Sequence, residues 1–348
     1  GLTRMSESIT RSRATGRTTL ADVARDAGVS PITVSRALRG ERSVDPMLVE
    51  RVRHSAHKLG YVPDPAARAL ASRRSSHVVV LVPLLTNQLF VELLETAQRT
   101  LRAAGYQTLV GITHYDPAEE EQLLGELLLH RPAGLLVTGW QHSAGTRQLL
   151  AASEIPCVHL MELEGGDERG QRHCVGFSQS DAAAELTGHL IDRGRRRIAY
   201  AAAQLDARTL QRLAGWRRRL QQDDLYEPAL EWLDPSPSSM ALGGQMFEQI
   251  LRQASPVDAI FFNNDDLAHG ALLAALRLQV KVPAQMAIVG FNDLPGSDQT
   301  LPPLTTVRTP RAEIGAQAAR RLLALMRGES VTPRALDVGY ELVVRGSS

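Results

Sequence analysis

Two arginines in the second half of the chain have the spacing of a ligand-binding pair. Arg208 and Arg212 lie four residues apart in ARTLQRLAGW, which reads as a helix, so both side chains lie on one helix face. A guanidinium group binds a carboxylate through two parallel hydrogen bonds, which are stronger than bonds between neutral groups. The pair therefore predicts a site for a small anion. The alternative is a charged helix face exposed to solvent.

A second group of residues, near the amino terminus, has the pattern of a DNA-reading element. The segment TTLADVARDAGVSPITVSRAL, residues 18–38, reads as helix, tight turn, helix. Thr19 and Ser30 are suitable N-caps, and Gly28 ends the first helix in the left-handed conformation. Two short helices joined in this way form a helix-turn-helix, whose second helix enters the major groove of DNA. Two ordinary packed helices are the alternative.

The second helix of this segment has side chains suited to base edges. Arg36 has the donors to contact guanine O6 and N7 together, whereas Ile32 offers only an apolar contact to a thymine methyl group. Thr19 and Ser30 are placed for phosphate. The predicted DNA-contacting residues of this segment are Thr19, Ser30, Pro31, Ile32, Thr33, Ser35 and Arg36. Because Pro31 and Ile32 are apolar, we expect the protein to recognise its DNA sequence through contacts with thymine methyl groups and through DNA shape.

Enzyme signatures are missing from the sequence. It contains no P-loop and no GxGxxG after the first expected strand, and GFSQS at 176–180 lacks the final glycine of a nucleophile elbow. His114, His142 and His269 are scattered without metal-ligand spacing. We therefore expect no catalytic residue, no metal and no cofactor.

The charge distribution separates a basic end from an acidic body. The net charge of the 348-residue chain is +1, yet residues 1–76 hold 14 Arg or Lys against 7 Asp or Glu. The remainder holds 25 against 31, which suggests a nucleic-acid-binding head on a globular sensor. The two cysteines, without CxxC spacing, and the lack of a membrane-length apolar run or signal-peptide core predict a cytoplasmic protein.

The expected elements explain how these residues are positioned. A third helix over 46–59 closes a small core with the first two, and a short helix follows within YVPDPAARALA, residues 61–71. From His77 onward, apolar runs of strand length alternate with amphipathic helices in two series. This alternation predicts two parallel sheets, each covered by helices on both faces. Ligands of such sheets bind at the carboxyl ends of the strands, here in the cleft between the halves.

Several local sequences together resemble the lactose-repressor (LacI/GalR) family over residues 18–345. They are LADVARDAGVSPITVSRAL, LGYVPDPAARALA, FFNNDDLAHGAL, IVGFND and PPLTTVRTP. The resemblance implies an all-α helix-turn-helix head, a hinge helix, and an α/β body like a periplasmic binding protein, made of two doubly wound parallel-sheet subdomains. It further implies a homodimer on a pseudo-palindromic double-stranded DNA operator, with a small-molecule effector and no membrane partner.

The resemblance also places the domain boundaries. Residues 1–17 form a disordered arm, 18–63 the head, 64–76 the hinge helix and linker, and 77–348 the effector-binding and dimerisation body. The chain crosses between the subdomains three times, near Gly176, Thr305–Thr306 and Thr332–Leu336. The first subdomain then comprises 77–175 plus 306–331, and the second comprises 176–305 plus 332–345.

Further site residues follow from the resemblance alone. Leu70, flanked by Ala67, is the wedge that the paired hinges insert into the minor groove, unless it only packs the head onto the body. The effector-binding positions are Asn87, Phe90, Glu162, Arg208, Arg212, Asn264 and Asn292. The alternative for each polar residue is a solvated loop tip.

Two departures from the family pattern indicate the class of effector. Asn292 stands where the family has an aspartate, and Ser238 stands where sugar sites have an aromatic platform. Relative to the family pattern, the effector site has one acidic side chain fewer and keeps both arginines, which favours binding of an anion. The stretches VPLLTNQLFVELL and QLDARTLQRLAGW also resemble the gluconate-utilisation repressor branch.

The expected function is therefore a repressor of a carbohydrate-catabolism operon, released by a sugar acid such as gluconate. A 2-ketogluconate, phosphorylated or neutral sugar stays open as the effector. A sugar-binding protein or an enzyme without DNA regulation is the alternative of a different class.

Overall fold

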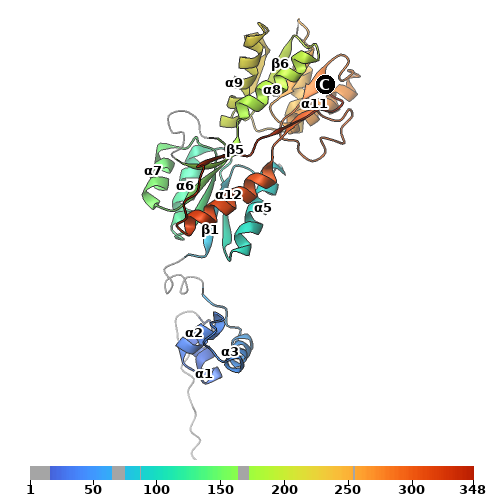
Figure 1. Ribbon diagram of the computed structural model, residues 1–348. Helices are drawn as coiled ribbons and strands as arrows, with labels where there is room; N and C mark the ends of the chain where they lie inside the picture. The colour runs from blue at the N-terminus through green and yellow to red at the C-terminus, as the bar shows by residue number, and fades with distance from the viewer. Residues whose placement is uncertain (1–15, 65–74, 87, 164–171, 254) are drawn as a thin grey trace, which may run out of the picture. The chain divides into compact units, whose positions relative to one another are not determined.

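The computed structural model describes residues 16–64, 75–86, 88–163, 172–253 and 255–348. The chain divides into two compact units, Gly1–Arg74 and Ser75–Ser348 (Figure 1). Most of the predicted arm and hinge helix lies outside the described residues. Each unit is therefore described by itself.

Three short helices form the first unit. They are α1 (Leu20–Ala27), α2 (Pro31–Leu38) and α3 (Pro46–Lys58). Each begins at a side-chain cap, because Thr19, Ser30 and Asp45 accept hydrogen bonds from backbone N–H groups of the first turn. Gly28 follows α1 with a φ of 67°, the left-handed conformation that the sequence predicts there.

One small apolar core joins these three helices. Its fully buried members come from all three, and partly buried side chains close its edges. The buried set is Val23, Ala24, Ala27, Val34, Ala37, Val52 and Ala56. Because this core occupies the inner face of α2, the opposite face of α2 lies open to solvent.

The second unit begins with a six-stranded parallel sheet in the order β11-β5-β4-β3-β1-β2. Its strands are β1 (His77–Val82), β2 (Gln107–Ile112), β3 (Gly134–Thr138), β4 (Cys157–Glu162), β5 (His173–Phe177) and β11 (Ala335–Asp337). Four helices cover it: α5 (Gln88–Ala103), α6 (Pro117–Leu128), α7 (Ala144–Ser153) and α12 (Arg311–Met326).

Strand β1 shows why this sheet needs helices on both faces. Val78 and Val80 belong to the large core cluster that includes α5 and α12, whereas Val79 and Leu81 belong to a cluster with Leu124 of α6. Alternate residues of a strand point to opposite faces, and all four are buried. The apolar run therefore marks a doubly covered parallel strand, as predicted.

A four-stranded parallel sheet in the order β7-β6-β8-β9 forms the second subdomain. Its strands are β6 (Ile198–Ala203), β7 (Glu231–Asp234), β8 (Ala259–Phe262) and β9 (Ala287–Val289). Its helices are α8 (Gln179–Asp192), α9 (Ala207–Gln222), α10 (Met240–Leu251), α11 (Asp265–Arg277) and the short 3-10 turn η2 (Pro228–Leu230). Helix α8 packs beside α9, and α10 packs beside α11.

The crossings between the subdomains correct one part of the predicted boundaries. Residues 332–345 were all expected in the second subdomain, but β11 pairs with β5 at the edge of the first sheet. The last crossing therefore follows Asp337. Strand β12 (Glu341–Val343) then pairs antiparallel with β10 (Thr306–Arg308), which carries the chain from β9 toward α12. A strand of three residues is too short for its hydrophobic pattern to indicate which of the two sheets it joins.

Neither a membrane-spanning helix nor a metal site occurs in the part of the chain that the structure describes. No described helix is both long and apolar enough to cross a bilayer. No cluster of three or more His, Cys, Asp or Glu side chains there has the proximity to hold a metal ion.

Candidate functional site

The solvent-facing side of α2 presents the side chains that the sequence predicts for base contact. Ile32 is 66% exposed although it is apolar, and the Arg36 side chain is 56% exposed. Pro31 is exposed as well, whereas Thr33 and Ser35 are half-buried. An exposed isoleucine beside an exposed arginine gives this face both an apolar contact and a hydrogen-bonding fork for base edges.

The hydroxyl groups predicted to contact phosphate already serve as helix caps. The Thr19 hydroxyl donates to Asp22 Oδ2 at 2.7 Å, and it accepts from the Asp22 N–H. The Ser30 hydroxyl accepts from the Thr33 N–H at 3.1 Å and lies 2.8 Å from the Thr33 hydroxyl. Ser30 can share its proton with a phosphate while it caps α2, whereas Thr19 must exchange its bond to Asp22.

Glu41 is the acidic neighbour of the solvent-facing side of α2. Its carboxylate lies 3.8 Å from Arg36 Nε and 2.9 Å from Arg39 Nη2. Both pairs are well exposed, and exposed ion pairs of this kind hold their partners weakly. Arg36 is therefore free to exchange Glu41 for a guanine. The predicted hinge residues Ala67 and Leu70, and the predicted effector residue Asn87, lie outside the described residues.

The predicted anion site lies at the junction of the two subdomains. Glu162 ends β4 of the first sheet, and its Oε1 accepts a hydrogen bond from Arg208 Nη1 of the second subdomain at 3.3 Å. Phe90 on α5 lies below the same guanidinium, with its ring centre 5.6 Å from the Arg208 carbon Cζ. Arg212 lies one turn further along α9. The structure thus brings Phe90, Glu162, Arg208 and Arg212 together.

Arg208 is a neutralised cation in this junction. It is 5% exposed, and it faces Glu162 and, at 3.9 Å, Asp206. Burial alone lowers the pKa of an arginine, but Asp206, Tyr115 and Glu162 outweigh burial and raise the pKa of Arg208. Gln211 donates a further bond to Glu162 Oε2 at 2.9 Å. The carboxylate is thereby fully engaged by α9.

Arg212 has a different environment, because its hydrogen-bond partners are neutral. Its Nε donates to Gln179 Oε1 at 2.9 Å, and its Nη1 donates to the Asn263 carbonyl at 2.7 Å. The ring centre of Phe291 lies 3.9 Å from its Cζ. No described carboxylate lies within ion-pair distance of this guanidinium. Burial lowers the pKa of Arg212 to about 10, so the group keeps its charge at neutral pH.

The two predicted asparagines occupy the strand ends but are held by local partners. The Asn264 side chain caps α11 through the Leu267 N–H, and its amide donates to the Ser238 hydroxyl at 2.8 Å. Asn292 is buried at a φ of 109°, and its Oδ1 accepts from the Thr309 hydroxyl at 2.9 Å. Neither side chain is a solvated loop tip.

Sequence reasoning missed several members of this junction. They are Tyr115, Gln179, Asp206, Gln211, Asn263 and Phe291. Asp206 had a local signal, since an aspartate just before a helix is a typical N-cap, and it does accept from the N–H groups of Arg208 and Thr209. Tyr115 had none, because its φ of 58° and its position beside Arg208 depend on the folded loop after β2.

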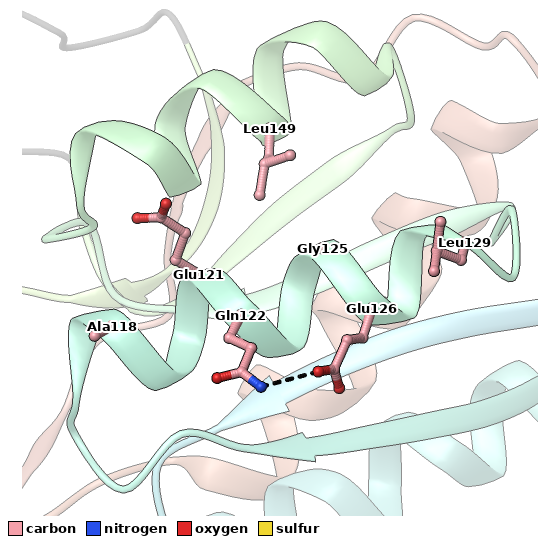
Figure 2. Close-up of a pocket in the computed structure, with 7 residues that line it drawn as sticks. All are labelled: Ala118, Glu121, Gln122, Gly125, Glu126, Leu129 and Leu149. Atoms are coloured by element: carbon pink, nitrogen blue, oxygen red, sulfur yellow. Dashed lines mark hydrogen bonds between the residues drawn. The ribbon is translucent and has the colours of Figure 1, made fainter.

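A surface groove between α6 and α7 is a separate feature with the wrong charge for an anion. It encloses about 500 Å³ and is lined by Ala118, Glu121, Gln122, Gly125, Glu126, Leu129 and Leu149 (Figure 2). Two of these residues are acidic, and the Gln122 amide donates to Glu126 at 3.0 Å. The groove therefore lacks the positive charge that the predicted anion site requires.

Comparisons with known proteins agree with both halves of the structure. A family described as bacterial regulatory proteins, lacI family, matches residues 19–64, and a periplasmic binding protein-like domain matches residues 187–348. The chain is 54% identical to the HTH-type transcriptional regulator GntR of Pseudomonas aeruginosa over 336 residues, which is 97% of each protein.

Two crystal structures are similar over long stretches. That of the transcription regulator GntR from Chromobacterium violaceum has a TM-score of 0.75 and 47% identity, over 78% of this chain and 99% of that one. The lac repressor dimer bound to operator and the anti-inducer ONPF has a TM-score of 0.83 and 26% identity, over 95% of this chain and 99% of that one.

Proposed function

Because this chain belongs to the LacI family and is a DNA-binding transcriptional regulator, we propose that it represses a carbohydrate-catabolism operon and that a sugar acid releases it from its operator. In this proposal the second helix of the head reads the operator, the body binds the effector at the subdomain junction, and two chains act together on a pseudo-palindromic site in the cytoplasm. No catalytic step is assigned to any residue.

The environment of Arg212 carries the effector assignment. Arg212 is buried and its hydrogen-bond partners are neutral, so among the described carboxylates only the longer-range attraction of Asp206 offsets its charge, and an incoming carboxylate would neutralise that charge directly. Arg208 does not supply this attraction, because Glu162 and Asp206 already neutralise it. A ligand with one negative charge therefore suits the junction.

This charge balance favours a sugar monocarboxylate over the alternatives. A neutral sugar would leave Arg212 without a counter-charge, and a phosphorylated sugar would bring a second negative charge close to Glu162 and Asp206. Gluconate and 2-ketogluconate each carry one carboxylate and several hydroxyl groups. Gluconate is our first choice, in keeping with the GntR-like sequence of the whole chain.

A mobility-shift titration tests the proposal. The protein is mixed with the DNA that flanks its own gene, and gluconate, 2-ketogluconate, 6-phosphogluconate or glucose is added at equal concentrations. We expect a specific complex that gluconate releases and glucose does not. Release by glucose at the same concentration would overturn the anion assignment, and absence of any specific complex would overturn the repressor.

The hinge contributes a further testable part of the proposal. If paired hinges place Leu70 between base pairs of the operator, Leu70→Ala should reduce DNA bending while the head stays folded. The reason is that the inserted leucine side chain replaces the stacking contact that is lost when one base step opens. A gel assay with circularly permuted operator fragments measures the bend. Ser76→Ala, at the end of the linker, is the control. Unchanged bending by Leu70→Ala would return this residue to a packing role.

A further inference from the structure

Arg311 bridges the two subdomains beside the proposed effector site. It is the first residue of α12, and its Nε donates to Glu92 Oε2 of α5 at 2.6 Å. Its Nη1 donates to the Asn292 carbonyl at 2.8 Å, and its Nη2 donates to the Asp293 carbonyl at 3.1 Å. One guanidinium thus joins a carboxylate of the first subdomain to two backbone oxygens of the second.

The first-subdomain end of this bridge is tightly packed. Helices α5 and α12 lie side by side (Figure 1) and approach so closely that a Cβ atom on Gly315 would lie 2.3 Å from the Leu93 carbonyl oxygen. Only a residue without a side chain permits that spacing. Glu92 and Arg311 therefore lie on two helices whose backbones are in close contact, and α5 also carries Phe90 under Arg208.

The second-subdomain end is a strained loop held by charge. Asn292 and Asp293 both have positive φ values, 109° and 52°, which cost energy for residues other than glycine. The Asp293 carboxylate accepts hydrogen bonds from Arg308 and Arg345, each at 2.8 Å. Burial raises the pKa of this carboxyl, but the two arginines outweigh burial and hold its pKa below the usual value. Arg311 adds to these contacts its two hydrogen bonds to the backbone carbonyls of the loop.

We propose that Arg311 is a positioning residue that holds the Asn292–Asp293 loop against the first subdomain and so favours the effector-binding arrangement. The inference rests on the proposed function. The bridge acts in the same arrangement as the Glu162–Arg208 contact, in which the two subdomains touch. A ligand that contacts both subdomains stabilises this arrangement, and a contact made in only one of two states biases the equilibrium between them.

Two substitutions and a matched control test this role. Arg311→Met removes the bridge, and Glu92→Gln removes one charge of it. Glu95→Gln removes a carboxylate from the same helix α5, where its partner among the described residues is exposed Arg99. We expect Arg311→Met to raise the gluconate concentration for half-release of the operator about 10-fold, and Glu92→Gln about 3-fold, as for lost charge-assisted hydrogen bonds. Operator affinity without gluconate should stay equal or become tighter.

A double variant separates positioning from simple structural damage. If Glu92 acts through Arg311, Glu92→Gln should have no further effect in the Arg311→Met background. Additive effects, or half-release at the wild-type concentration in both single variants, would overturn the proposal. Weaker operator binding in the variants without gluconate would overturn it too, since the bridge favours the released state.

Hydrogen–deuterium exchange of the ligand-free protein keeps this test independent of the effector. Segment 287–294 should exchange faster in Arg311→Met and Glu92→Gln than in wild type and in Glu95→Gln. Faster exchange together with wild-type protein that ignores every sugar acid would support the bridge and refute the effector assignment. Unchanged exchange would refute the bridge, whatever the effector is.

Discussion

Replacing Arg212 by methionine should weaken gluconate binding about 10- to 150-fold and leave operator binding unchanged, so that the variant represses permanently. The reason is the loss of a charge-assisted contact, which contributes about 1.5–3 kcal/mol in a buried site. Methionine keeps much of the length of the side chain and its contact with Phe291. Calorimetry measures gluconate binding, and a mobility-shift titration measures operator binding.

The control for this prediction lies on the same helix. Arg218→Met removes an equal charge from α9, but the Arg218 side chain is 48% exposed and pairs with Asp181. It should bind gluconate normally. Arg208→Met is a less clean test, because it also strips the buried Glu162 carboxylate of its cation. Wild-type gluconate affinity in a folded Arg212→Met protein would show that the carboxylate binds elsewhere.

Arg36→Ala should weaken specific operator binding by about 1–3 kcal/mol and relax the sequence preference at one base pair of each half-site. Arg36 lies on the open face of α2, where among the described residues its guanidinium has a 3.8 Å contact to Glu41, so it can turn to a base edge. Titration of wild type and variant against operators changed at single positions measures both effects.

Arg39→Ala separates base reading from charge. It removes the same charge from the end of α2 and shares Glu41 as its partner. We expect a smaller loss, equal for all operator variants, with a shallower dependence of affinity on salt. If Arg36→Ala shows that same uniform pattern, Arg36 contacts phosphate and the specificity of α2 lies in Ile32 and its neighbours.

The head was largely predictable because its signals are local. A cap such as Ser30, a left-handed glycine such as Gly28 and the periodic residues Val23 and Val34 act within a few positions of the chain. The alternating strands and helices of the body were predictable for the same reason. The sequence-based prediction placed strand β11 in the wrong subdomain. Three residues are too few to show a hydrophobic periodicity, and the partner strand β5 lies about 160 residues away in the chain.

The charge balance of the effector site was not predictable. Arg208 and Arg212 look equivalent in the sequence, four residues apart on one helix. Only the fold brings Glu162 from the other subdomain to Arg208 and gives Arg212 neutral hydrogen-bond partners. Long-range pairing of this kind depends on how two sheets meet, which no local pattern contains. The Arg311 bridge escaped prediction for the same reason.

Calorimetric titration of gluconate into the free protein and into its operator complex tests the central claim most directly. If operator and effector shift the same conformational equilibrium of the protein, their effects on each other must be reciprocal. The operator must then weaken gluconate binding by the same factor by which gluconate weakens operator binding. We expect a factor of about 5–150, the usual range of such coupling, and no measurable binding of glucose. Equal gluconate affinity in the free and operator-bound protein, or glucose binding as tightly as gluconate, would contradict the account.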